Sequence, residues 1–296
     1  MTGARAEQHP VRIGVQLAPQ HGTVAQLLDA AARMEDLGVD LVMGWDHFFP
    51  LTEPDRPGDH DGAHFEAFTL LAAMAERTHR VEFGPLVAAT PFRNPDLLAD
   101  MARTIDHISA KGSGVGRFVL GLGAGWNQRD FEEYGFGVGE PGAAGLATVG
   151  LATVGLGTVG QRLTAFEAAV PRVLARMPKL TPPPTRRIPI LIGGAGERRT
   201  LRVVAEHADL WHAFGDEETL RHKSMVLNEH CAAIGRDPAT IERSTGTSVR
   251  GLGVGDPETA ERFVALGFST FIVAISPPDL DDTPVRALLA WRDRRG

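Results

Sequence analysis

Short apolar runs alternate along the chain with longer segments whose apolar residues recur every three or four positions. The first run, at residues 11–17 (VRIGVQL), has its apolar side chains mostly at alternate positions and indicates a β-strand. Thr23 can cap the helix that follows, because its hydroxyl can accept a backbone N–H. The apolar side chains on one face of that helix are Val24, Leu27, Leu28, Ala31 and Met34. Gly38 is expected to end the helix, and residues 39–45 predict the second strand.

The same alternation continues to the end of the chain. The runs that predict strands are residues 80–90, 116–125, 188–194, 209–214, 242–252 and 269–275. The segments that predict helices are residues 64–78, a stretch that starts at Pro95 after the cap residue Asn94, and residues 161–176, 196–208, 216–234, 256–267 and 284–294. Eight strand–helix units predict a parallel sheet with helical crossovers. Such units close naturally into a (β/α)₈ TIM barrel of the α/β class.

The barrel is expected to form a single domain at residues 11–296, after a disordered segment at residues 1–10. The length of 296 residues fits this prediction, because such barrels typically take about 250 residues as one unit. A doubly wound open sheet is the alternative. It fits less well, since the first strand-to-helix turn, QLAPQHGT, lacks the G-x-G-x-x-G pattern of dinucleotide-binding sheets.

The composition narrows the classes of function. A net charge of −7 and a pI near 5.9 argue against a nucleic-acid surface, and no run of Lys and Arg suggests one locally. No uninterrupted apolar stretch approaches the length of a membrane span. The lone Cys231 excludes an internal disulfide framework and a cysteine-based metal cluster. We therefore expect a cytoplasmic protein that binds a small-molecule substrate and binds neither nucleic acid nor membrane. The oligomeric state is left open, with a homodimer as one possibility.

Active sites of TIM barrels form at the carboxyl ends of the strands, so candidate residues are sought directly after each strand. Trp45, Asp46, His47 and Phe48 follow the second strand, where an acid and an imidazole can supply hydrogen bonds or a proton. The alternative is a solvated loop in which Asp46 merely caps a turn. On these residues alone the second interpretation is favoured.

Glycines follow the fourth and fifth strands. Gly123 and Gly125, with Trp126 beside them, would permit close approach by a flat ligand, although glycine is also common where ordinary strands end. The other group, Gly193, Gly194 and Gly196, leads directly into a helix with Arg198 and Arg199 at its start. Backbone N–H groups at a helix start form an anion site, for which phosphate is the natural ligand. A tight structural turn explains these glycines equally well.

Residues 145–159 repeat a short unit, GLATV-GLATV-GLGTV, which is far shorter than the repeats of solenoid proteins. Tandem duplication of a loop accounts for its origin, and a role as a lid over the site is left open. The chain has no G-x-S-x-G motif and no P-loop, which argues against a barrel hydrolase or aldolase.

Four stretches in order along the chain resemble the luciferase-like monooxygenase superfamily, and more narrowly its branch of oxidoreductases that use coenzyme F420, a deazaflavin. They are WDHFFP (45–50), FRNPDLLADMARTIDHIS (92–109), RFVLGLGAGWNQRDFEEYGF (117–136) and IPILIGGAGERRTLRVVAEHADLWHAFGD (188–216). The resemblance runs from about residue 11 to residue 275. It implies a (β/α)₈ barrel, in agreement with the independent count of strand–helix units.

The resemblance also implies roles for named residues. The position of Asp46 typically contacts the cofactor ring in this family, and the position of His47 lies near the reacting carbon. A cis peptide bond that does not precede proline supports the ring, and it is expected at Leu86–Val87. The glycines at 193, 194 and 196 match the family's phosphate-binding turn, and those at 123 and 125 with Trp126 are expected beside the cofactor.

The activity implied is hydride transfer between C5 of F420 and a small organic substrate. Asp46 would orient the ring, and His47 would donate or accept a proton. Where sugar-phosphate dehydrogenases of the family carry a catalytic Glu, this chain has Trp126, which argues against a sugar-phosphate substrate. The alternatives are a monooxygenase that uses reduced FMN on the same barrel and a flavin-binding protein without catalysis.

Overall fold

A computed structural model of the chain describes residues 9–51, 61–136, 157–247, 254–277 and 280–295. Its strands all pair in parallel, in the order β3-β2-β1-β9-β8-β7-β6-β5-β4. They are β1 (Arg12–Leu17), β2 (Leu41–Gly44), β3 (Glu82–Pro85), β4 (Ala88–Ala89), β5 (Leu120–Gly123), β6 (Ile190–Gly193), β7 (Leu210–His212), β8 (Glu242–Gly246) and β9 (Thr270–Ile275). A parallel bridge between Phe83 and Phe118 joins β3 to the chain just before β5 and brings the two edges of the sheet together. The predicted TIM barrel is confirmed.

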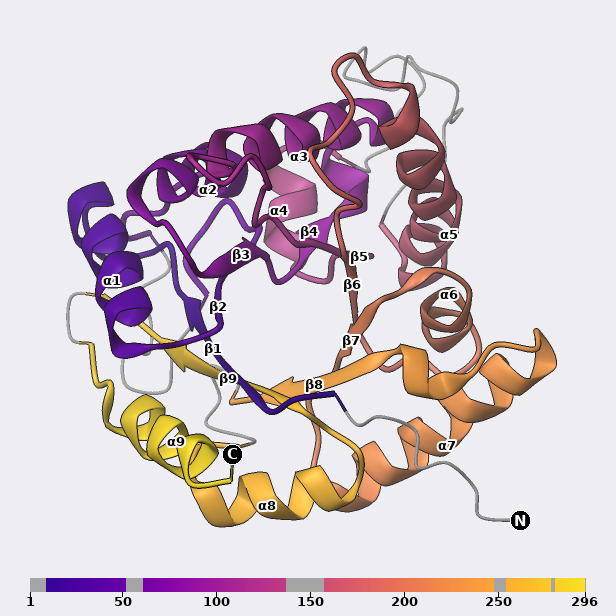
Figure 1. Ribbon diagram of the computed structural model, residues 1–296. Helices are drawn as coiled ribbons and strands as arrows, with labels where there is room; N and C mark the ends of the chain where they lie inside the picture. Colours follow the sequence, from indigo (N-terminus) through magenta and orange to yellow (C-terminus); the bar gives the residue numbers. More distant parts are fainter. Residues whose placement is uncertain (1–8, 52–60, 137–156, 248–253, 278–279, 296) are drawn as a thin grey trace.

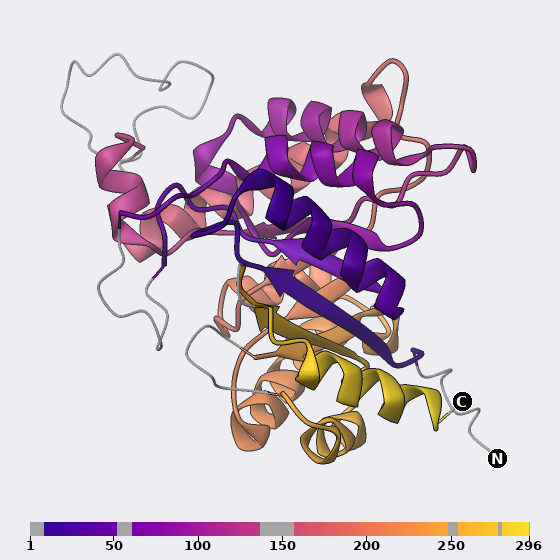
Figure 2. The same cartoon turned by 90° about the vertical axis from the view of Figure 1, so that its left-hand side faces the viewer.

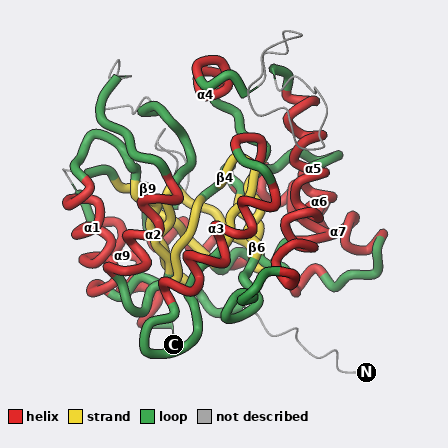
Figure 3. Tube along the Cα trace, turned by 90° about the horizontal axis from the view of Figure 1, so that it is seen from above, coloured by secondary structure: helices red, strands yellow, loops and turns green. Residues whose placement is uncertain are grey.

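The helices other than α4 surround the sheet as an outer ring (Figure 1). They are α1 (Val24–Leu37), α2 (Ala67–Arg77), α3 (Pro95–Ser109), α4 (Gln128–Glu133), α5 (Val159–Arg176), α6 (Thr200–His207), α7 (Glu217–Ala233), α8 (Pro257–Ala265) and α9 (Thr283–Asp293). Short 3₁₀ turns occupy Thr90–Phe92, Met177–Lys179 and Pro238–Thr240. Figures 2 and 3 show that α4 lies at one end of the barrel, and the start of β1 and the end of α9 lie at the other.

The capping residues predicted for α1 and α3 are found at the ends of these helices. The Thr23 hydroxyl accepts the Gln26 N–H and forms a capping box, and Gly38 ends α1 with a φ of 101°. Asn94 caps α3, with Pro95 at the first helical position. The expected apolar face of α1 is wrong at one residue, because Val24 in the first turn is 38% exposed.

Three segments differ from the sequence prediction. The strand expected at 80–90 is divided into β3 and β4 at the Leu86–Val87 peptide bond, which is cis as predicted. The helix expected from 196 begins only at Thr200, because residues 197–199 form a turn. The α4 helix lies in a segment expected to be loop. Three stretches that the sequence analysis discussed lie outside the described residues. They are residues 1–8, residues 145–156 of the repeat, and residues 248–252 at the end of the strand expected at 242–252.

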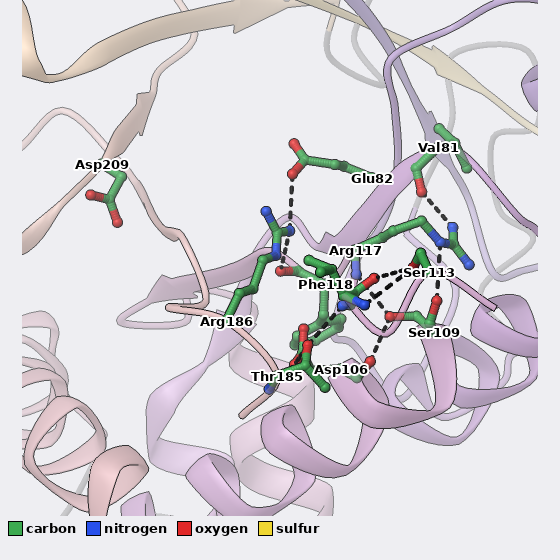
Figure 4. A network of polar contacts seen from close by, with 12 residues as sticks. Val81, Glu82, Asp106, Ser109, Ser113, Arg117, Phe118, Thr185, Arg186 and Asp209 are labelled. Atoms are coloured by element: carbon green, nitrogen blue, oxygen red, sulfur yellow. Dashed lines mark hydrogen bonds and ion pairs between the residues drawn. The ribbon is translucent and has the colours of Figure 1, made fainter. Parts of the chain in front are cut away.

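The amino-terminal end of the barrel is closed by buried polar contacts (Figure 4). The guanidinium of Arg117 donates to the backbone carbonyls of Val81 and Thr78 at 2.6 and 2.8 Å. Arg186 donates to Glu82 at 2.9 Å, also at this end. Because the strands begin here, these contacts fix the barrel, and the candidate site is sought at the opposite end.

Candidate active site at the carboxyl ends of the strands

His47 emerges from the end of β2 and is 8% exposed. Its Nδ1 lies 2.6 Å from Oδ2 of Asp130, a residue of α4 whose exposure is 0%. The same carboxylate accepts the Phe48 N–H at 3.0 Å and the Asn127 side-chain N–H at 3.1 Å. An acceptor that is fixed in this way favours the tautomer with the proton on Nδ1, so Nε2 is the nitrogen of His47 that remains to exchange a proton.

Asp130 was not among the residues that the sequence singled out. It stands 83 positions after His47, inside a segment that we expected to be an open loop. The available signal was weak: Asn127, followed three residues later by an acid, is typical of a helix start, and no spacing rule connects it with the end of β2. Only the fold brings the imidazole and the carboxylate together.

Aromatic and imidazole rings surround this pair. The Trp126 ring meets His47 edge-on, with 5.5 Å between ring centroids, and the Trp126 residue is 60% exposed. The Trp45 ring centroid lies 6.3 Å from that of His47, and Trp45 Nε1 donates to Nε2 of His64. Burial, and secondarily the nearby His47, lower the pKa of His64 to about 4, so His64 is neutral and can accept that hydrogen bond. The structure therefore brings Trp126 and His47 together, as expected for one site.

Asp46 is enclosed by its own chain and is 2% exposed. Arg93 donates to both carboxylate oxygens, at 2.6 and 2.9 Å, and the Ala89 N–H donates to Oδ2 at 3.0 Å. Burial raises the pKa of Asp46, while Arg93 and the Ala89 N–H oppose the rise. Asp46 thus ties the end of β2 to β4, and its contact with a cofactor ring stays a prediction.

The Leu86–Val87 bond lies directly before β4 and is held from inside the barrel. The Gln16 side chain on β1 donates to the Leu86 carbonyl at 2.7 Å. Val87 occupies space left by two glycines: a Cβ on Gly123 would lie 2.5 Å from one Val87 methyl, and a Cβ on Gly193 would lie 2.8 Å from the other. These two glycines are therefore required by packing within the chain, whatever they also offer a ligand.

Gly125 also has a structural explanation. Its φ is 72°, a conformation that favours glycine, and a Cβ there would lie 2.8 Å from the Phe131 ring. Packing therefore accounts for the glycines after the fourth strand, because each absent side chain makes room for Val87 or Phe131, and their contact with a flat ligand stays a prediction.

The turn after β6 is locked to β7 by two hydrogen bonds. The Gly194 N–H donates to the His212 carbonyl at 2.9 Å, and Trp211 Nε1 donates to the Gly194 carbonyl at 2.8 Å. Gly194 has a φ of 120°, and a Cβ on Gly196 would lie 2.9 Å from the Thr200 hydroxyl. Gly194 thus provides the backbone conformation of a tight turn, and Gly196 leaves room for Thr200 at the start of α6.

A phosphate-binding role for this turn stays a prediction. The first N–H groups of a helix have no partner within it, and at the start of α6 the Leu201 N–H donates to the Gly196 carbonyl at 3.0 Å. Arg198 is exposed beside them. Arg199 is not available in the same way, because its guanidinium forms an ion pair with Glu167 of α5 and donates to the Gly160 carbonyl. Of the two arginines, Arg198 is therefore the one predicted to reinforce an anion.

Two negative findings concern the described residues only. No group of three or more His, Cys, Asp and Glu side chains in that part of the chain could hold a metal ion. None of the described helices is long and apolar enough to cross a membrane.

The sequence matches the family model described as luciferase-like monooxygenase over residues 8–263. F420-dependent glucose-6-phosphate dehydrogenases of Amycolatopsis mediterranei and Kribbella flavida are 32% and 34% identical over 117 residues, 39% of this chain. The aligned region covers 32% and 31% of those proteins, about a third of their length. An uncharacterized protein of Mycobacterium tuberculosis is 24% identical over 228 residues, which cover 76% of this chain and 75% of that protein.

Solved structures of low sequence identity share the fold. An F420-dependent secondary alcohol dehydrogenase in complex with an F420–acetone adduct aligns with a TM-score of 0.73 at 16% identity, over 94% of this chain and 97% of its own. The coenzyme F420-dependent tetrahydromethanopterin reductase of Methanopyrus kandleri aligns with a TM-score of 0.69 at 15% identity, over 95% and 97%. The EDTA monooxygenase of Chelativorans sp. BNC1 aligns with a TM-score of 0.69 at 13% identity, over 97% and 94%.

Proposed function

Because the chain belongs to the luciferase-like monooxygenase family, we propose that it is an oxidoreductase that transfers a hydride between coenzyme F420 and a small organic substrate. The observation that carries this proposal is the buried His47–Asp130 pair at the carboxyl ends of the strands, 2.6 Å between Nδ1 and Oδ2. Hydride transfer to or from an alcohol carbon requires a proton to move at the attached oxygen, and an oriented imidazole supplies that step.

The choice of F420 over FMN rests on the relatives. The dehydrogenases aligned over 117 residues are F420-dependent by name, as are two of the structures that share the fold. The deazaflavin, when bound, supplies a two-electron hydride donor or acceptor at C5. The turn at residues 193–196 would hold its phosphate with Arg198, and the backbone at Leu86–Val87 would support its ring.

His47 Nε2 exchanges the proton at the substrate oxygen in this proposal, and the Asp130 carboxylate keeps Nδ1 protonated. As the imidazole takes up a proton at Nε2, the buried carboxylate stabilises the imidazolium that forms. Trp126 stands edge-on against the same ring, and the family resemblance implies that it occupies the position of a catalytic Glu in sugar-phosphate dehydrogenases. We therefore assign proton handling to His47 and favour a substrate that is not a sugar phosphate.

Asp130→Asn tests the positioning role. The amide keeps the volume of the side chain but removes the charge that favours Nδ1–H and stabilises the imidazolium, so we expect kcat to fall about tenfold or more. The affinity for F420 should stay within a factor of about two, because the turn at 193–196 is untouched. Turnover is followed by the absorbance of F420 in a screen of small alcohols and ketones.

Glu132→Gln on the same helix is the matched control, since Glu132 is exposed and its carboxylate accepts a hydrogen bond from the Gln128 side chain. It should leave kcat and cofactor affinity unchanged. Wild-type kcat in the Asp130→Asn variant would remove Asp130 from the mechanism.

A monooxygenase that uses reduced FMN is the second candidate, because the family model carries that description and an EDTA monooxygenase shares the fold. The two activities differ in their use of oxygen. An electrode measurement with reduced FMN should show no oxygen uptake above the rate without protein. Protein-dependent uptake coupled to a product would favour the monooxygenase.

A further inference from the structure

His212, the last residue of β7, has one imidazole nitrogen paired and the other without a hydrogen-bond partner. The residue is 3% exposed. Its Nδ1 lies 2.8 Å from the Ser244 hydroxyl on β8, whereas Nε2 is buried and unpartnered in the described structure. Buried polar atoms are nearly always hydrogen-bonded, because leaving one unpaired costs the free energy of its lost hydration. The unpaired nitrogen therefore requires an explanation.

The side chain of His212 points into the barrel. Side chains alternate along a strand, and Leu210, two residues earlier, packs in the cluster inside the barrel with Leu191 and Ile272. Nε2 is at the tip of the ring, further from the β7 backbone than Nδ1, so it lies deeper in the barrel interior. Phe214 stands edge-on against the ring at 4.8 Å between centroids.

His212 is also adjacent to the turn that is predicted to bind a phosphate. Its register partner on β6 is Gly193, and its carbonyl accepts the Gly194 N–H at 2.9 Å. Burial lowers the pKa of His212 to about 3, so the ring is neutral at physiological pH. A neutral imidazole offers one N–H or one lone pair, and the Ser244 hydroxyl can serve either tautomer because it both donates and accepts.

We propose that Nε2 of His212 forms a hydrogen bond with an uncharged oxygen or nitrogen of the bound cofactor, close to the phosphate held by the turn at residues 193–196. This inference rests on the proposed function, because it takes F420 as the ligand. The two imidazoles at the carboxyl ends of the strands then have different roles. His47 exchanges a proton with the substrate, and His212 binds the cofactor. Nε2 has no hydrogen-bond partner in the described structure, and the bound ligand would supply one.

The test is a double variant, His212→Leu with Ser244→Ala, titrated with F420 and followed by its absorbance. Replacing both partners of a buried hydrogen bond by apolar groups is nearly neutral for folding, so the thermal midpoint of the free protein should not fall. The dissociation constant of F420 should rise about five- to tenfold, as expected for one lost hydrogen bond. A merely structural His212 would leave the dissociation constant of F420 unchanged, and that result would overturn the proposal.

His107→Leu is the control, because His107 is exposed on α3 and bonds the Pro183 carbonyl; neither quantity should change. If the double variant does not fold, wild-type protein labelled with ¹⁵N-histidine decides the matter. The Nε2 resonance of His212, assigned through the Ser244→Ala variant, should shift when F420 saturates the protein. No shift at saturation would refute the hydrogen bond. Wild-type protein that does not bind F420 would refute the proposed function itself, and the inference with it.

Discussion

His47→Ala is expected to lower kcat about 100- to 10,000-fold while the dissociation constant of F420 stays nearly unchanged. The magnitude is that of a general acid–base group in the transition state. The separation of the two parameters follows from the geometry, because the Nδ1 side of His47 is used by Asp130 within the chain and the proposed cofactor contacts lie elsewhere. A change confined to kcat identifies an interaction made in the transition state.

Steady-state rates and equilibrium titration of the same His47→Ala preparation measure both quantities. His107→Ala, an exposed histidine on α3, should match wild type in both. Wild-type turnover in His47→Ala would mean that the end of β2 is not the catalytic part of the site, and the family would then account for the fold alone.

Asp46→Ala is expected to lower the free energy of unfolding by about 3 kcal/mol. This is the largest loss of stability expected among the variants proposed for this protein. Removing one partner of a buried ion pair leaves the other charge buried and uncompensated, and that cost is typically 3–5 kcal/mol. The low end applies because Arg93 keeps a second acceptor, Glu66, at 2.6 Å. The Ala89 N–H also loses its acceptor, so β4 should shift and the affinity for cofactor should fall as well.

Denaturant unfolding of Asp46→Ala gives the free energy, and Asp96→Ala is its matched control. Asp96 also binds an arginine at 2.6 Å, but the side chains of this pair with Arg172 are 40% and 33% exposed, so its removal should cost less stability. An Asp46→Ala protein as stable as wild type would contradict the ion-pair account. If that protein also bound F420 normally, Asp46 would lose its predicted role with the cofactor.

The sequence predicted those features that depend on local chemistry. The capping box at Thr23, the left-handed Gly38 and the start of α3 at Asn94 and Pro95 are set by residues within a few positions of one another. The barrel itself followed from eight repeats of one local pattern. The cis bond at Leu86–Val87 came from the family resemblance, and the structure has it at that position.

Features that depend on contacts between distant segments were not accessible from the pattern. Asp130 faces His47 only because α4 folds over the end of β2, and Arg93 binds Asp46 from 47 positions away. The glycines after β5 signalled a close approach, but the approaching groups, Val87 and Phe131, belong to the chain itself. A glycine in the sequence indicates that another group approaches the backbone closely, but it does not identify that group.

The central claim, that this barrel is built for a deazaflavin, is tested most directly by titrating the purified protein with F420 and with FMN while following each chromophore. We expect F420 to bind with a dissociation constant of about 1 μM or tighter, equivalent to roughly 8 kcal/mol, and FMN to bind much more weakly. Equal or tighter binding of FMN would contradict the assignment.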